Sequence, residues 1–214
     1  ISIFQGIKEY LDDSNIMFSQ GCDIESNDYS RFDKAVNIAK KADKIIMVLG
    51  EDYNMSGEAA SRTNIKLPGI QTQLIKTIRD ELPNKPIILV LMNGRPLDLT
   101  IEDSLADAIL EVWYPGTSGG LGVADILFGK YNPSAKLPIT FPRNLGQVPI
   151  YYNQKNTGRP ISKENPTEDY KSNYIDSPNT PLYPFGHGLS YTTFKYSEIK
   201  LSSDKIKESE ILKA

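Results

Sequence analysis

Carboxylates gather in one polar segment of the chain, Gly50–Lys66. Glu51, Asp52 and Glu58 lie in it, and Arg62 follows four residues after Glu58. Two carboxyl groups are the minimum for cleaving a glycosidic bond, because one donates a proton to the leaving oxygen while the other acts as nucleophile or activates water. The same residues also fit a solvated acidic loop in which Arg62 forms a plain ion pair. Residue types alone therefore leave both interpretations open.

The sequence gives less support to a serine hydrolase mechanism or to a metal site. The single histidine, His187, lies between two glycines in an aromatic segment, which predicts a tight turn rather than a general base. Ser56 and Ser61 lack the Gly-x-Ser-x-Gly elbow of a serine hydrolase. Cys22 is the single cysteine, so an intrachain disulfide is excluded and a zinc or iron site is not expected.

The glycine-rich turn Gly116–Gly120 could bind phosphate if it precedes a helix. It lacks the Gly-Lys-Ser/Thr ending of a P-loop and is not Gly-x-Gly-x-x-Gly, so nucleotide binding stays a weaker alternative. The glycines instead predict close helix–strand packing. Trp113 and Tyr114, just before them, could stack on a sugar or belong to the core.

The periodicity of the chain predicts an α/β fold with a mainly parallel sheet. Continuous apolar runs predict buried parallel strands over Ile45–Leu49, Pro86–Met92 and Ala108–Trp113. Helical spacing predicts helices over Ile3–Leu11, Tyr29–Lys41, Pro68–Leu82 and Ser118–Phe128. Shorter strands are predicted over Asn15–Gln20 and Lys136–Phe141, and an irregular polar excursion over Asn153–Asn179.

Ligands of open parallel sheets bind beyond the carboxyl ends of the strands. Three predicted loops occupy that edge: Gly50–Lys66, Asn93–Pro96 and Tyr114–Ser118. The first is long for a connection between a strand and a helix, and such loops are often functional. A site, if present, should be built from these three loops.

Composition excludes some partners. The 214 residues carry a net charge of −3 and no basic stripe, so neither nucleic acid nor an anionic membrane is an expected partner. No apolar run approaches the roughly 20 residues needed to span a bilayer. The chain opens without methionine, as if inside a helix, so we expect it to be a piece of a longer protein.

Three segments together resemble one family. The run Trp113–Pro142, with Tyr-Pro-Gly-Thr-Ser-Gly-Gly and Tyr-Asn-Pro-Ser-Ala-Lys-Leu-Pro, resembles the C-terminal α/β domain of family 3 glycoside hydrolases. So does Pro181–Phe194, with Pro-Phe-Gly-His-Gly-Leu-Ser-Tyr. Tyr151–Pro160 narrows the likeness to the periplasmic β-glucosidases of Gram-negative bacteria.

The resemblance implies a domain organisation. Residues 1–195 would form a three-layer α/β sandwich of the flavodoxin-like kind. Residues 196–214 would be a linker or the start of a fibronectin type III-like domain. An N-terminal (β/α)8 barrel, absent from this sequence, would carry the aspartate nucleophile. The resemblance also implies a periplasmic or secreted location, and no cofactor or metal.

The resemblance also implies a role for one residue of the acidic segment. In many members the acid/base glutamate follows a Ser-Gly pair, which Ser56-Gly57-Glu58 matches. Met55, Ser56 and Arg62 would line the side of the site that holds the leaving group. Family members vary in the position of the acid/base, so Glu51 and Asp52 remain substitutes for Glu58.

The expected function is that of a domain in a retaining exo-β-glycosidase, a β-glucosidase. The whole enzyme would remove terminal β-linked glucose from oligosaccharides, and the present chain alone would be inactive because one of the two carboxylates is missing. The alternative is a non-catalytic α/β module that buttresses the barrel or binds carbohydrate.

Overall fold

Three parallel strands form a sheet whose carboxyl ends share one edge. The computed structural model describes residues 1–156, 158–162 and 169–213. In it, β1 (Ile45–Gly50), β2 (Ile87–Met92) and β3 (Ala108–Glu111) pair in that order. Ile45 pairs with Ile87 and Ile88 with Ala108, so each strand leads into its loop at nearly the same level. The predicted apolar strands are confirmed, the third ending two residues early.

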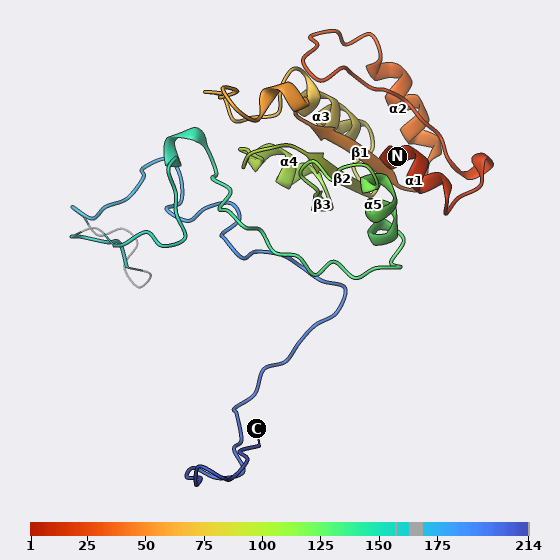
Figure 1. Cartoon of the computed structure of the whole chain (residues 1–214). Coiled ribbons are helices and arrows are strands. Elements are labelled where there is room, and N and C mark those ends of the chain that lie inside the picture. The colour runs from red at the N-terminus through yellow and green to blue at the C-terminus, as the bar shows by residue number, and fades with distance from the viewer. Residues whose placement is uncertain (157, 163–168, 214) are drawn as a thin grey trace.

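Helices cover both faces of this sheet (Figure 1). The helices of one layer are α2 (Phe32–Lys41), α3 (Gln71–Glu81) and α4 (Thr100–Leu105). The other layer holds α1 (Ile3–Lys8) and α5 (Gly119–Leu127). The prediction of a three-layer α/β sandwich with a mainly parallel sheet is confirmed. The helix α4 is one that the sequence pattern does not predict.

Alternate strand residues point into two separate cores. Met47 and Leu89 pack with residues of α2 and α3, whereas Val90 packs with Ile3 and Val123 on the opposite face. Leu89 and Val90 are both fully buried. Burying such a side chain stabilises the fold by about 1.5–3 kcal/mol. Because both faces are covered, these strands read as continuous apolar runs rather than as an alternating pattern.

The helices α1 and α5 touch through their backbones. A Cβ atom placed on Gly6 would lie 2.0 Å from the carbonyl oxygen of Gly120, and one on Gly120 would lie 2.1 Å from that of Ser2. Ser2 also begins α1 with a capping box, in which its hydroxyl accepts from Gln5 N at 3.2 Å and the Gln5 side chain accepts from Ser2 N at 2.8 Å. Only glycine fits at this helix crossing.

Two predicted strands are wrong. At the first, Asn15–Gln20, a 3-10 turn over Asp13–Asn15 is followed by chain without strand pairing, and a cavity of about 320 Å³ lies between this segment and β1. At the second, Lys136–Phe141, just Phe141 forms a bridge, antiparallel to Tyr183. Leu137 N also donates to His187 O at 2.8 Å in the same register, but no continuous ladder joins it to Phe141 in the described chain.

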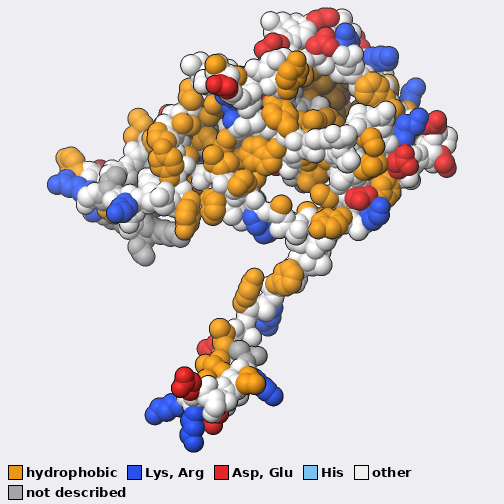
Figure 2. All heavy atoms as spheres, viewed as in Figure 1, with side chains coloured by type: hydrophobic (Ala, Val, Ile, Leu, Met, Phe, Trp, Pro, Cys, Tyr) orange, Lys and Arg blue, Asp and Glu red, His pale blue; other side chains and the backbone are white. Residues whose placement is uncertain are grey.

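The chain after α5 adds little regular structure. In its described residues the single helical element is a 3-10 turn at Leu145–Gln147, and the described part of Asn153–Asn179 has neither helix nor strand, as predicted. The last residues extend away from the sheet (Figure 1). Hydrophobic side chains show on the surface of this part (Figure 2). Its exposed large hydrophobic residues include Tyr131, Tyr151, Tyr152, Phe185, Tyr191 and Phe194.

Replacing Gly6 with alanine should destabilise the domain. The new methyl group must push α1 away from α5, and overpacking of this kind costs about 1–3 kcal/mol. Urea unfolding followed by circular dichroism measures the change. Gly122→Ala is the matched control, because Gly122 lies on the exposed side of α5 with nothing within 4 Å of a Cβ. That variant should be neutral or more stable by up to about 1 kcal/mol. Equal urea midpoints for Gly6→Ala and Gly122→Ala would refute the close contact.

Candidate active site

The three loops predicted at the carboxyl edge of the sheet do meet. Glu51 N donates to Met92 O at 2.8 Å and so continues the pairing of β1 with β2 by one residue. The Ser56 hydroxyl donates to Gly94 O at 3.3 Å, which joins the first loop to the second. The Tyr114 hydroxyl donates to Asp52 O at 3.0 Å, which joins the third loop to the first.

Glu51 is the buried carboxylate of the acidic segment. Its side chain has no exposed surface. Its Oε1 atom lies 2.6 Å from Arg62 Nη1 and 3.1 Å from Arg95 Nε, and its Oε2 atom accepts from Gly94 N at 3.2 Å. Both oxygens are therefore occupied by donors of the protein, and this carboxylate has no open side from which to reach a substrate.

Asp52 has a local partner. Its Oδ1 atom accepts from Asn54 N at 3.0 Å and from Asn54 Nδ2 at 2.8 Å. The carboxylate thereby caps the 3-10 turn Tyr53–Met55. The side chain is oriented toward its own turn.

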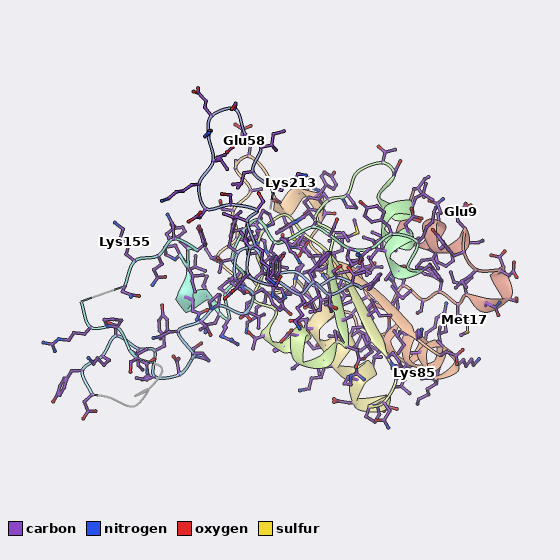
Figure 3. The ribbon with its side chains drawn as sticks, turned by 90° about the horizontal axis from the view of Figure 1, so that it is seen from below. Glu9, Met17, Glu58, Lys85, Lys155 and Lys213 are labelled. Atoms are coloured by element: carbon purple, nitrogen blue, oxygen red, sulfur yellow. The ribbon has the colours of Figure 1, made fainter. Side chains whose placement is uncertain are left out.

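Glu58 has the opposite environment. It is exposed at the periphery of the molecule (Figure 3), and within the described residues no hydrogen bond or ion pair holds its carboxylate. Its neighbours Gly57 and Ala59 have φ angles of 119° and 59°. This left-handed backbone turns the chain sharply on both sides of Glu58 and is costly for residues other than glycine. The tip of the loop therefore presents one unpaired carboxylate to the outside.

The three residues predicted to line the leaving-group side lie at the base of the loop. Arg62 pairs with Glu51, not with Glu58, and it also donates to Lys66 O at 3.1 Å. Ser56 is half-buried against Gly94, where its hydroxyl is engaged. Met55 is half-buried, and its carbonyl accepts from Arg95. The loop surface near Glu58 thus has Met55 and Ser56 at its root, while the Arg62 guanidinium is turned inward.

Two polar residues of this edge escaped the sequence analysis. Arg95 lies in the predicted second loop, but nothing in the pattern shows that its guanidinium turns back under the first. Glu111 occupies an apolar run, and such a charged residue in a predicted buried strand is the signal that could have found it. Its Oε1 atom accepts from Trp113 N at 2.8 Å, whereas Oε2 is buried without a partner in the described chain.

Burial raises the pKa of Glu111 to about 7. The hydrogen bond from Trp113 N opposes this rise, and the nearby negative charge of Glu51 adds to it. At neutral pH, Glu111 is therefore shared between its protonated and its charged form. The carboxyl end of the sheet holds two buried carboxyl groups, of which one is paired with arginines and the other is not.

The remaining candidate motifs take structural roles. The His187 ring stacks on Tyr183 with centroids 5.1 Å apart, and its carbonyl accepts from Leu137 N, as a turn residue would. Trp113 packs against the core beside Phe141. The glycine-rich turn was predicted to pack a helix against a strand, and this is wrong. Gly120 instead packs on the backbone of Ser2, at the start of α1.

In the described part of the chain no three His, Cys, Asp or Glu side chains come together as a metal site would need. Over the same residues, no helix is long and apolar enough to cross a membrane.

Glu111→Gln should remove a pH dependence of stability. The folded-state pKa of about 7 lies above the usual 4.5, so the folded chain keeps a proton that the unfolded chain releases. The resulting stabilisation is complete below pH 4.5 and is lost as the pH rises through 7. Between pH 5 and pH 8 the wild type should therefore lose up to about 3 kcal/mol more than the variant. Urea unfolding of both proteins at the two pH values checks this; parallel losses would show that Glu111 is charged throughout.

Comparison with known proteins identifies the family. Residues 1–191 match the family described as glycosyl hydrolase family 3 C-terminal domain. A protein named periplasmic beta-glucosidase from Salmonella typhimurium is 57% identical over 171 residues, which are 80% of this chain and 22% of that protein. A protein named beta-xylosidase from Formosa agariphila is 38% identical over 96% of this chain and 27% of its own length.

Comparison with solved structures leads to the same family as the sequence comparisons. A crystal structure of a beta-glucosidase from Listeria innocua in complex with isofagomine superposes with a TM-score of 0.88 at 37% identity, over 94% of this chain and 27% of that one. The chain thus spans about a quarter of the length of the proteins it matches. By sequence and by fold, it belongs to the glycosyl hydrolase family 3 C-terminal domain family.

Proposed function

We propose that this chain is the part of a retaining exo-β-glycosidase, a β-glucosidase, that supplies the acid/base carboxylate to the active site. Glu58 is that carboxylate. The observation that carries the proposal is the contrast among the three acidic residues of one loop. Glu51 is buried between arginines and Asp52 caps its own turn, whereas Glu58 alone stands exposed and unpaired at the tip.

The rest of the site lies outside this sequence. An N-terminal (β/α)8 barrel of the same protein supplies the aspartate nucleophile and most contacts to the sugar, and the Gly50–Lys66 loop reaches over it. The substrate is a terminal β-linked glucose of an oligosaccharide or glucoside, as the name of the Salmonella relative suggests. The same name supports a periplasmic or secreted location. Residues 196–214 are a linker to a fibronectin type III-like domain or the start of that domain.

The chemistry needs two steps and no cofactor. Glu58 gives its proton to the leaving oxygen while the barrel aspartate bonds to the anomeric carbon and the glycosidic bond breaks. The Glu58 carboxylate then takes a proton from water, whose oxygen displaces the aspartate. An exposed carboxylate suits a loop that reaches its substrate by closing onto a second domain, because the closure removes water from the reacting groups. Met55 and Ser56, at the root of the loop, lie on the leaving-group side.

Glu58→Ala in the whole enzyme tests this role. With a substrate whose leaving alcohol needs protonation, kcat/KM should fall roughly 100- to 10,000-fold. With 2,4-dinitrophenyl β-glucoside the first step needs no proton, so azide should restore turnover and yield β-glucosyl azide. Asp52→Asn is the matched control on the same loop, because asparagine keeps the oxygen that caps Asn54. Azide rescue of an Asp52 variant instead of the Glu58 variant would overturn the assignment.

The isolated chain separates this function from that of a non-catalytic module. A chain that supplies one of two carboxylates should neither hydrolyse aryl β-glucosides nor bind glucose measurably in calorimetry. A self-sufficient carbohydrate-binding module should bind the sugar without the barrel. Glucose binding to the isolated chain that disappears when Glu58 is replaced would favour the module.

A further inference from the structure

A buried carboxylate under the loop tip holds two arginines together. The Glu51 side chain is fully buried, and its Oε1 atom contacts Arg62 Nη1 at 2.6 Å and Arg95 Nε at 3.1 Å. Both guanidinium groups are themselves largely buried, with 18% of each side chain exposed. Charge-assisted hydrogen bonds of this kind are stronger than those between neutral groups. Removing the carboxylate would leave two cations close together with no anion between them.

The two arginines connect the Glu51 carboxylate to the loop backbone on both sides of Glu58. Arg95 donates to Met55 O, three residues before Glu58, and to Ala60 O at 3.2 Å, two residues after it. Arg62 donates to Lys66 O at 3.1 Å, near the end of the loop. These bonds bracket a tip of four residues, 56–59, so its two ends cannot move apart while Arg95 stays in place.

Close packing at Gly94 also holds the base of the loop in place. A Cβ atom on Gly94 would lie 2.0 Å from Ser56 Oγ and 2.9 Å from the Tyr114 ring. Gly94 N also donates to Glu51 Oε2 at 3.2 Å. The second loop therefore fits between the first and third, and Glu51 fixes its backbone at that point.

We propose that Glu51 is a positioning residue, which sets the place of the Glu58 carboxylate through Arg95 and Arg62 and makes no contact with substrate. This rests on the proposed function, in which Glu58 is the acid/base. Glu51 holds Arg95 under the loop, Arg95 fixes Met55 O and Ala60 O, and these fix the tip. A misplacement of about 1 Å in a catalytic group can cost roughly 100-fold in rate.

The test is a double-mutant cycle in the whole enzyme. Glu51→Gln keeps the size of the side chain and removes its charge. It should lower kcat about 10- to 100-fold for a substrate that needs protonation, with KM changed less than about threefold. In a Glu58→Ala background the same substitution should change the rate less than about twofold, since the group that it positions is already gone. A Glu51→Gln loss of equal size in both backgrounds would overturn the proposal.

Azide chemistry separates this proposal from the proposed function. Glu51→Gln retains Glu58, so azide should yield no β-glucosyl azide, whereas Glu58→Ala should yield it. Formation of the azide product by the Glu51 variant would make Glu51 itself the acid/base and sink the positioning role. If Glu58→Ala is not rescued, the proposed function fails, whatever Glu51 does.

Two further variants guard against simple unfolding. Glu102→Gln is the matched control, because Glu102 is a buried carboxylate, 2% exposed, that bonds to Thr72 on α3 and not to the loop; its kcat should stay within about twofold. Arg95→Lys keeps the charge next to Glu51 but loses the planar fork that reaches Met55 O and Ala60 O. It should reproduce the loss of kcat, and it decides the question if Glu51→Gln does not fold. Wild-type kcat in Arg95→Lys would contradict the proposal.

Discussion

The carboxylate of Glu51 is the interaction on which the architecture of the loop edge depends. A lone buried carboxylate would be costly, and so would two arginine side chains without an anion. When the carboxylate and the two guanidinium groups are paired, these two costs offset one another. The remaining guanidinium N–H groups donate to carbonyl oxygens of a loop that has little regular structure of its own. The edge of the sheet thus gains a rigid base from residues that are far apart in sequence, while the Glu58 carboxylate beyond it has no hydrogen bond or ion pair in the described chain.

This separation of base and tip explains how one short segment can hold three carboxylates with three different environments. Glu51 follows β1 by a single residue and so remains within the layer of side chains above the strand ends. Asp52 turns back onto Asn54, and Glu58 sits beyond the Gly57 turn, out of reach of the arginines. Distance from the strand end, more than residue type, decides which carboxylate is available for chemistry.

The sequence predicted the elements whose pattern is strong and local. The apolar runs of β1 and β2 are confirmed, because strands covered on both faces show no alternation. The helix α4 was not predicted, since it buries Glu102 and exposes Ile101, the reverse of an amphipathic pattern. The acidic loop was found from its length and its position at the sheet edge. The roles within it could not be told apart, because the partner that distinguishes Glu51 is Arg95, 44 residues later in the chain.

The crossing of α1 and α5 has a consequence for recombining this domain with its relatives. The two glycines are 114 residues apart, yet each occupies the space that a side chain on the other helix would need. A chimaera could take the first helix from one parent and the fifth from another. It would have a clash or a gap at the crossing whenever the two parents carry small residues of different size at these two positions. Breakpoints that keep both helices from the same parent avoid the problem, even though they exchange a larger and less contiguous part of the chain.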